Sequence, residues 1–426
     1  MLGHAGVAAG LFGTIRFRPY GAAPFPERGG RYGSRTGRLQ MVDMRQVYEN
    51  HLPRRVITGR GASGRLAEIC RQRGWNRAFV VSDRGVESAG LLAPVVASLQ
   101  AAGMLAGESV DVTPEPPLAD VSRLAEQIRE AASDVVIGLG GGSVMDATKV
   151  AALVALRGGG PADYVGIGKA GGRGLPTILV PTTAGTGSEA TFVAILTDTA
   201  AGTKVGVVDP ALLADVAIVD PALTDCLPPA VTAAAGMDAL VHAIEAFIAR
   251  VATPIARGLA LEAARHIGPA LERVCRHPGD EEARDRMAIG SHLAGMAFAN
   301  ASCCAVHALA LPLGGRFHIP HGVITGCFAG ELMRHNAPAS AADFAALGTA
   351  LAWGALEPHA FADRLDATAR AIGLRAALDR VVVPTADIAP MARDAASNRR
   401  LIDPNPVPVT AADAERIYRA VLQVGE

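Results

Sequence analysis

Short apolar runs alternate with longer stretches of helical spacing between about residues 54 and 225. The runs that predict strands are residues 77–82, 108–113, 134–137, 177–180 and 216–219, and the helical stretches are 91–102, 118–132 and 143–156. Repetition of strand, helix and strand is typical of a parallel sheet covered by helices on both faces. We therefore expect an α/β domain with a parallel sheet over residues 44–227.

The pattern changes after Pro228. Long stretches rich in Ala and Leu, with helical spacing, run from Ala230 to the C-terminus, and none of them contains a convincing strand. The adjacent prolines at 228 and 229 mark the change. A chain of 426 residues also exceeds the usual size of a single hydrophobic core. The sequence thus predicts an all-α second domain over residues 228–426.

Residues 1–43 differ from the rest of the chain. Gly, Arg and Pro dominate the segment, and no apolar periodicity is visible. We expect a disordered extension, or a start placed upstream of the true one at Met41 or Met44, and exclude the segment from the fold argument.

Composition narrows the function to small molecules. A net charge of -1 gives no field that would attract nucleic acid or an anionic membrane, and we expect neither as a partner. The apolar stretch at 135–156 contains Asp146 and Lys149, so we do not interpret it as a membrane span. Six cysteines without a C-x-x-C pair fit a reducing compartment, and we expect the cytoplasm.

Two loops at strand ends carry candidate binding groups. GLGGGS at 138–143 follows a predicted buried strand and opens a helix, which is the context of a phosphate-binding loop. Without a strict G-x-G-x-x-G it indicates only an anion, and a glycine-rich turn is the alternative. The loop PTTAGTGSEAT at 181–191 offers several hydroxyls after another strand. Asp83 ends the strand at 77–82, where a carboxylate favours NAD over NADP; a surface turn is the other interpretation.

A carboxylate and several histidines suggest a metal centre in the second domain. Asp238 and His242 are four residues apart in a helical stretch and share one face, although such a pair is more often a surface contact. His307 and His321 follow in VHALALPLGGRFHIPHG. One carboxylate with imidazoles suits Fe(II) or Zn(II) better than Mg²⁺ or Ca²⁺.

Four segments of the chain resemble the signature regions of the iron-containing (group III) alcohol dehydrogenases. They are GGGSVMDATK, PTTAGTGSEAT, AAGMDALVHAIEAF and VHALALPLGGRFHIPHG, in the family's order and at similar spacing. The resemblance spans roughly residue 56 to the end of the chain. It implies a Rossmann-like N-terminal domain, a helical C-terminal domain with the site between the two, and a homodimer or larger assembly.

The resemblance also implies roles for individual residues. The implied metal ligands are Asp238, His242, His307 and His321, with Fe(II) as the metal and Zn(II) as the alternative. The implied NAD contacts are Asp83, Gly141, Gly142, Ser143, Asp146, Thr182, Thr183, Thr186 and Lys204.

Three positions depart from the family pattern. Many members have a second histidine four residues after the third metal ligand, where this chain has Leu311. Val193 and Glu115 stand where asparagines are common. We expect the alcohol proton to leave through water, a ribose hydroxyl or His318, and the pocket to be more apolar than in diol-handling relatives.

The resulting hypothesis is a metal-dependent enzyme that transfers hydride between NAD(H) and a small alcohol and aldehyde pair. A maleylacetate reductase or hydroxy acid dehydrogenase is the alternative within the family, with Arg316 binding the substrate carboxylate. A lyase of the dehydroquinate synthase type would need a cluster of basic residues that we do not find in the sequence. A non-catalytic descendant is disfavoured because all four implied metal ligands are present.

Overall fold

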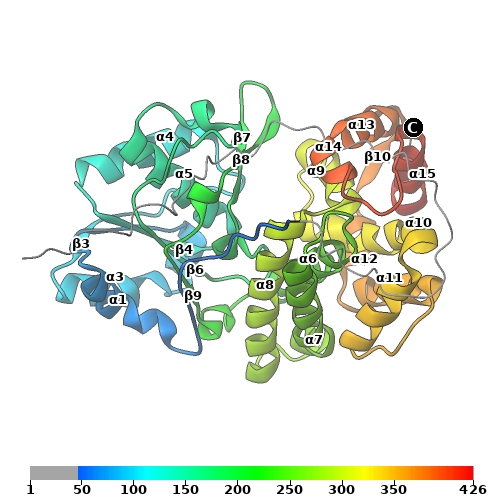
Figure 1. Ribbon diagram of the computed structural model, residues 1–426, viewed down its shortest axis with the longest axis horizontal. Helices are drawn as coiled ribbons and strands as arrows, with labels where there is room; N and C mark the ends of the chain where they lie inside the picture. Colours follow the sequence, from blue (N-terminus) through cyan, green and yellow to red (C-terminus); the bar gives the residue numbers. More distant parts are fainter. Residues whose placement is uncertain (1–46, 426) are drawn as a thin grey trace, which may run out of the picture.

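The computed structural model describes residues 47–425, so the predicted extension at 1–43 lies outside the described residues. An α/β part and a helical part lie side by side, with the long helix α8 between them (Figure 1). The six strands of the main sheet are all parallel, in the order β1-β9-β6-β4-β2-β3. Their bounds are β1 (Val56–Thr58), β2 (Ala78–Val81), β3 (Leu105–Ser109), β4 (Val135–Gly140), β6 (Thr177–Pro181) and β9 (Val216–Val219).

Helices cover both faces of this sheet. Alternate residues of β2 pack in opposite directions: Phe79 and Val81 join one apolar cluster, and Ala78 and Val80 join another. The first cluster includes α4 (Leu118–Glu130) and α5 (Gly142–Arg157), and the second includes α1 (Leu66–Arg73) and α3 (Leu92–Ala101). A short α2 (Arg84–Ser88) follows β2. The predicted α/β fold class is confirmed.

A second, three-stranded sheet was not predicted. It contains β5 (Gly166–Ile167), β7 (Val193–Asp198) and β8 (Thr203–Val208), and β7 and β8 form an antiparallel hairpin. The strand predicted at 108–113 was also misplaced, because β3 ends at Ser109 and only an isolated bridge joins Asp111 to Asp83. Short 3-10 turns occur at η1 (Ala62–Arg65), η2 (Pro161–Tyr164), η3 (Ser188–Ala190), η4 (Pro210–Leu212) and η5 (Pro221–Thr224).

The helical part begins at Pro229. Its long helices are α6 (Pro229–Ile248), α7 (Pro254–Arg276), α8 (Glu281–Ala301), α9 (Ala305–Phe317), α10 (His321–Ala350) and α11 (Pro358–Ala371). The remaining helices are α12 (Leu374–Leu378), α13 (Thr385–Ser397), α14 (Arg399–Ile402) and α15 (Ala411–Val421). The predicted helical domain is confirmed, with the addition of β10 (Val382–Pro384) and β11 (Gln423–Gly425), which pair in parallel. The exact boundary at residue 228 stays a prediction.

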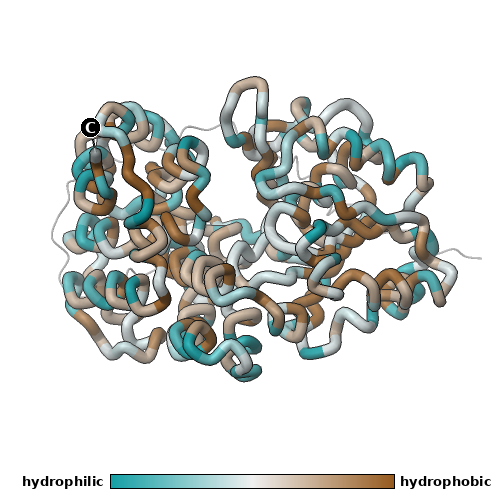
Figure 2. Tube along the Cα trace, turned by 180° about the vertical axis from the view of Figure 1, so that it is seen from behind, coloured by the Kyte–Doolittle hydropathy of each residue, from teal (hydrophilic) through white to brown (hydrophobic). Residues whose placement is uncertain are grey.

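Helix α6 forms the centre of the helical part. It is long and apolar enough to cross a membrane by composition alone, but 78% of its most apolar stretch is buried within the protein. Nearly every residue from Gly236 to Ile248 is inaccessible to solvent. Figure 2 shows the same arrangement, with apolar segments inside and hydrophilic segments on the outer turns of the helices. Helix α6 is therefore a core helix, and polar groups on it lie in the interior.

Candidate active site

The predicted nucleotide residues gather at one edge of the main sheet. Strands β2, β4 and β6 are neighbours and parallel, so the segments that follow them leave the sheet on the same side. Asp83, the loop before α5 and the loop after β6 therefore share this edge. Ligands of open α/β sheets bind beyond the carboxyl ends of the strands.

The glycines before α5 are required by close packing. A Cβ on Gly140 would lie 2.5 Å from Cγ2 of Val144, and a Cβ on Gly142 would lie 2.8 Å from Cγ2 of Thr186. Gly142 begins α5, so the unpaired backbone N–H groups of the helix start lie beside the hydroxyl-rich loop. The helix start and the adjacent loop together make an anion site of the kind that binds a pyrophosphate.

The polar side chains at this edge also hold the loops in place. Asp83 caps α2 by accepting a hydrogen bond from the backbone N–H of Val86. Asp146 accepts hydrogen bonds from Oγ of Ser188 and from the backbone N–H of Ile195. Contacts of Asp83 and Asp146 with a nucleotide stay predictions, because the described contacts of both carboxylates are internal.

A buried lysine links the two loops, and the sequence analysis gave it no role. The Lys149 ammonium donates to Oγ of Ser188 at 2.6 Å, to Oγ1 of Thr191 at 3.1 Å and to the backbone carbonyl of Val193 at 2.9 Å. Burial lowers the pKa of this group, while the carboxylates of Asp146 and Glu189 favour its charged form. Lys149 thus fixes the loop after β6 against α5.

Lys204 pairs with Glu115, one of the family departures. Its ammonium lies 2.5 Å from Oε1 of Glu115, whose backbone N–H donates to Oγ of Ser143. Glu115 adopts a positive φ of 55°, which is uncommon for a residue with a side chain. The charge of Lys204 also adds to the lowering of the pKa of His321.

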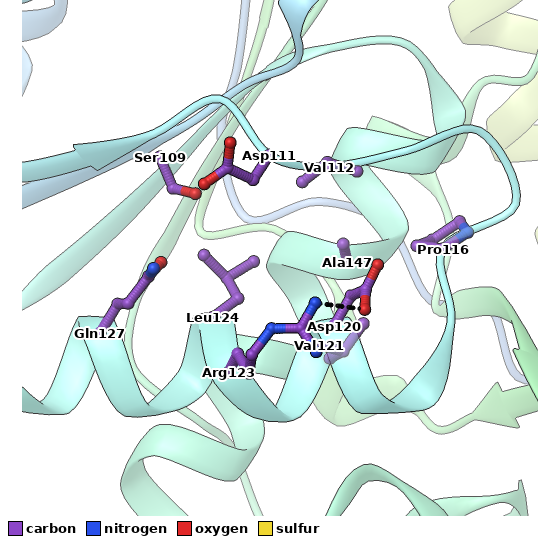
Figure 3. A pocket seen from close by; sticks show the side chains of 10 residues that line it. All are labelled: Ser109, Asp111, Val112, Pro116, Asp120, Val121, Arg123, Leu124, Gln127 and Ala147. Carbon is purple, nitrogen blue, oxygen red and sulfur yellow. Dashed lines mark hydrogen bonds and ion pairs between the residues drawn. The ribbon is translucent and has the colours of Figure 1, made fainter.

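A small cavity lies beside this region. Its volume is about 180 Å³, and it lies between the end of β3 and helix α4, where Figure 3 shows Asp111 above the Asp120–Arg123 ion pair. None of the predicted site residues lines it. Ligand pockets usually measure about 300–1,000 Å³, so this cavity is smaller than a typical ligand pocket.

The four predicted metal ligands converge from three helices. Nδ1 of His242 lies 3.9 Å from the Asp238 carboxylate, and Nε2 of both His307 and His321 lies 3.7 Å from it. Candidate ligand atoms of Asp238, His307 and His321 all lie within 4.8 Å of one another. His242 belongs to a second such group, with His307 and Cys303. Helices α6, α9 and α10 thus bring together donors that suit a divalent transition metal.

Buried partners orient these ligands. Nδ1 of His307 lies 2.6 Å from Oε2 of Glu245 and donates to this carboxylate, so Nε2 is the ring nitrogen that faces Asp238. Nε2 of His307 and Nδ1 of His242 are both buried without a hydrogen-bond partner among the described residues. Oγ1 of Thr325 donates to Asp238 at 3.0 Å. Two unpaired imidazole nitrogens beside a fixed carboxylate fit a bound metal cation.

The charges in this cluster are strongly coupled. Burial opposes ionisation of Asp238, but His242, His321 and His307 outweigh it and hold the carboxyl pKa well below its usual value. Burial lowers the pKa of His321 to about 4, and the neighbouring imidazoles add to this effect. Burial also raises the pKa of the Cys303 thiol, but His307 and His242 bring it down to about 7. At neutral pH the cluster therefore holds Asp238 as a carboxylate and His321 as a neutral imidazole.

Other residues of the sequence hypothesis lie at the margin of the site. His318 ends α9 with a positive φ of 52° and is exposed, and its side chain makes no hydrogen bond or ion pair within residues 47–425. Leu311 is half-buried against the helical core. Arg316 pairs with Asp387 and Asp394 of α13, so two carboxylates already neutralise its charge.

The loop after β6 joins the two parts of the molecule. A Cβ on Gly185 would lie 2.7 Å from Cβ of Ala235, which is three residues before Asp238 on α6. Backbone atoms of Gly187 approach Gly295 of α8 closely enough that neither position has room for a Cβ. The predicted nucleotide loop is thus in direct contact with α6, which carries Asp238 and His242, and with α8.

Sequence reasoning gave no role to Glu245 or Cys303. Glu245 lies three residues after His242 and seven after Asp238, so helical spacing would have placed it on the same face. Cys303 gave no such signal, because a break between α8 and α9 separates it from His307.

A parallel α/β domain with an anion-binding edge, joined to a buried cluster of carboxylate and imidazoles, defines a nucleotide-linked, metal-dependent oxidoreductase. Family comparison gives the same result. The profile of "Iron-containing alcohol dehydrogenase" matches residues 53–221, and that of "Fe-containing alcohol dehydrogenase family, C-terminal" matches residues 232–422. The chain belongs to the iron-containing alcohol dehydrogenase family. This confirms the family resemblance, the fold and the enzyme class that the sequence predicts.

Individual relatives cover most of the chain. It is 38% identical to "Long-chain-alcohol dehydrogenase 1" of Geobacillus thermodenitrificans over 85% of this chain and 93% of that one. It is 38% identical to "Sulfoacetaldehyde reductase" of Bilophila wadsworthia over 65% of this chain and 72% of that one. The crystal structure of sulfoacetaldehyde reductase from Bifidobacterium kashiwanohense in complex with NAD⁺ superposes with a TM-score of 0.82 at 31% identity, covering 88% of this chain and 99% of that one.

Proposed function

We propose that this enzyme transfers hydride between NAD(H) and a small alcohol and aldehyde pair, with a divalent metal held by Asp238, His242, His307 and His321. The observation that carries the proposal is the buried cluster in which unpaired nitrogens of His242 and His307 lie beside the ionised Asp238. We propose Fe(II) as the metal and Zn(II) as the alternative. When bound, such a cation supplies Lewis acidity that polarises a carbonyl or alcohol oxygen.

The residues of the chain bind, orient and exclude water. Backbone N–H groups at Gly141, Gly142 and Ser143 and the hydroxyls of Thr182, Thr183 and Thr186 are proposed to bind the NAD phosphates, supported by their shared place at the sheet edge. Lys204 is proposed to contact the cofactor as well, since it pairs with Glu115, whose backbone N–H donates to Ser143 of the phosphate-binding loop. Glu245 fixes the ring of His307, and burial of the cluster keeps water away from it.

Proton transfer is proposed to use water, a ribose hydroxyl or His318. Leu311 cannot carry a proton, and His318 is a free, exposed imidazole at the end of the helix that carries His307. A pH–rate profile of His318→Ala that matches the unmodified enzyme would exclude His318 from the path.

The substrate is proposed to be an aliphatic or aromatic alcohol of modest size, since Leu311 adds apolar surface. The alternative of a carboxylate substrate bound by Arg316 is disfavoured, because Asp387 and Asp394 already pair with that guanidinium.

The direct test is an assay of purified protein with NAD and a panel of alcohols, and with NADH and the matching aldehydes. Protein loaded with Fe(II), and separately with Zn(II), should change nicotinamide absorbance, and metal-free protein should not. A parallel titration with NADP tests the preference for NAD. No absorbance change with any alcohol or aldehyde, with metal loaded, would contradict the proposal.

Assembly and compartment are further proposals. The six cysteines are all free thiols, which supports the cytoplasm as the compartment.

Within residues 47–425, the edge strands β1 and β3 have a partner strand on one side only, which supports a homodimer or larger assembly. Light scattering of the purified protein tests the assembly, and a monomer would contradict it.

A further inference from the structure

A break between two helices brings a cysteine thiol to the metal cluster. Helices α8 and α9 meet at an angle of 103°, and Ser302 in the break adopts a positive φ of 66°. Cys303 follows it and is buried. One candidate ligand atom from each of His242, Cys303 and His307 lies within 4.8 Å of the other two.

Two further observations indicate a ligand between these residues. Nδ1 of His242 and Nε2 of His307 are buried and lack a hydrogen-bond partner among the described residues. His242 is 5% exposed and His307 is 6% exposed, so water does not readily satisfy these nitrogens. A buried polar atom without a partner costs free energy unless a ligand pairs with it.

The chemistry of this group differs from that of its neighbour. Asp238, His307 and His321 offer oxygen and nitrogen donors, whereas His242, Cys303 and His307 offer nitrogen and sulfur. Thiolate with imidazole favours Zn(II) and other thiophilic cations over Fe(II). Zinc bonds of about 2.0–2.3 Å put tetrahedral donors roughly 3.5 Å apart, so donors that lie within 4.8 Å of one another need to close by at most about 1.3 Å.

We propose that His242, Cys303 and His307 form a second metal position, which binds a thiophilic divalent cation through the Cys303 sulfur. Binding forms one metal–sulfur bond and breaks the S–H bond, and the proton leaves to solvent. The second position shares His307 with the Asp238–His307–His321 group and takes His242 from the predicted ligand set. A cation held there therefore competes with the proposed catalytic metal. The inference depends on the proposed function in one respect only, namely that His242 and His307 are also proposed ligands of the catalytic metal.

The test is a titration of metal-free full-length protein with Cd(II), followed by ultraviolet absorption of the thiolate-to-cadmium charge-transfer band. The unmodified protein should develop the band and saturate at one thiolate per bound ion. Cys303→Ser should lose the band, and Cys327→Ser should keep it, because Cys327 is a buried cysteine of α10 outside both groups. Far-ultraviolet circular dichroism verifies that each variant is folded, and Cys303→Ala replaces the serine variant if that one is not.

A third variant separates the two positions. His321→Ala removes a ligand of the Asp238 group only, so the charge-transfer band should persist. The inference is overturned if the unmodified protein shows no band, if Cys303→Ser retains it, or if His321→Ala abolishes it. Dehydrogenase activity of Fe(II)-loaded Cys303→Ser reports on the proposed function separately, because that activity does not need the sulfur. Added Zn(II) should inhibit the Fe(II)-loaded unmodified enzyme more than Cys303→Ser.

Discussion

The buried carboxylate of Glu245 accepts hydrogen bonds from three N–H groups, the backbone N–H of Cys304, the backbone N–H of Val306 and Nδ1 of His307. These bonds fix the start of α9 and the tautomer of His307 together. The hydrogen-bond partner of a metal-ligating histidine fixes the tautomer and the orientation of the ring, so its loss usually weakens metal binding.

Glu245→Gln should weaken metal binding by about 10- to 100-fold, the usual effect of losing such a partner. Glutamine keeps the shape of the glutamate side chain. Its amide NH₂ is a donor, however, and would face one of the three N–H groups without accepting a hydrogen bond from it. Competition with a chelator measures the affinity. Glu272→Gln, on α7 and outside both metal groups, is the control and should bind metal normally. Equal affinity of Glu245→Gln and the unmodified protein would contradict this role.

At the scale of elements, α10 approaches α6 through a glycine. A Cβ on Gly322, the residue after His321, would lie 2.0 Å from the backbone carbonyl oxygen of Ala234. Backbone cannot move aside as a flexible side chain can. The close contact thus places His321 against the helix that carries Asp238.

Gly322→Ala should destabilise the protein by about 1–3 kcal/mol, the usual cost of overpacking, and should weaken metal binding because α10 must move away from α6. Gly315→Ala is the matched control, since a Cβ there meets nothing within 4 Å and alanine favours the helix. Denaturant unfolding of both variants measures the difference. Similar stabilities of the two variants would be inconsistent with the close approach.

Glu272 of α7 connects to α11 through Arg364 at 2.7 Å and Thr368 at 3.1 Å. Burial opposes ionisation of Glu272, but Arg364, Thr368 and Arg276 lower the carboxyl pKa below its usual value of 4.5. A lowered folded-state pKa means that the stabilisation is present above pH 4.5 and is lost as the pH falls through the folded value. Glu272→Gln should cost up to about 1 kcal/mol at pH 7.

The difference between Glu272→Gln and the unmodified protein should shrink as the pH is lowered below 4.5. Urea unfolding at a series of pH values measures it. Glu126→Gln, at an exposed position of α4, is the control for the same substitution at the surface. A stability difference that grows toward low pH would contradict a lowered pKa of Glu272 in the folded protein.

Elements differ in how far the sequence predicts them. The strands β6 and β9 are continuous apolar runs and were predicted at their observed places, because burial on both faces leaves a clear pattern. The hairpin of β7 and β8 and the pair β10 and β11 were missed, since these strands depend on pairing with a partner more than on their own composition. In the site, Asp238 and His242 follow from helical spacing, whereas Cys303 depends on the turn at Ser302.

At the scale of the whole molecule, α8 joins the two parts through a buried pair. Nδ1 of His292 on α8 lies 2.9 Å from Oε1 of Glu189 in η3, and both side chains are almost inaccessible. Since η3 belongs to the loop that approaches the nucleotide edge, the pair connects that loop to the helical part.

His292→Leu should destabilise the protein by about 2–4 kcal/mol, because Glu189 would be buried without a partner. The double variant His292→Leu with Glu189→Met removes both polar groups and should recover part of the loss. Midpoints of denaturant unfolding measure both effects. Equal stabilities of the single and double variants would show that the pair has no energetic coupling.

The four proposed ligands differ in their access to solvent. The side chains of Asp238, His242 and His307 are 6%, 7% and 8% exposed, whereas the His321 side chain is 37% exposed. His321 is thus the proposed ligand most open to solvent, and we expect the metal to exchange past it. We expect a dinucleotide bound at the nearby sheet edge to cover this opening and to slow the release of the ion. Protein saturated with NAD should lose its metal to a chelator more slowly than free protein does.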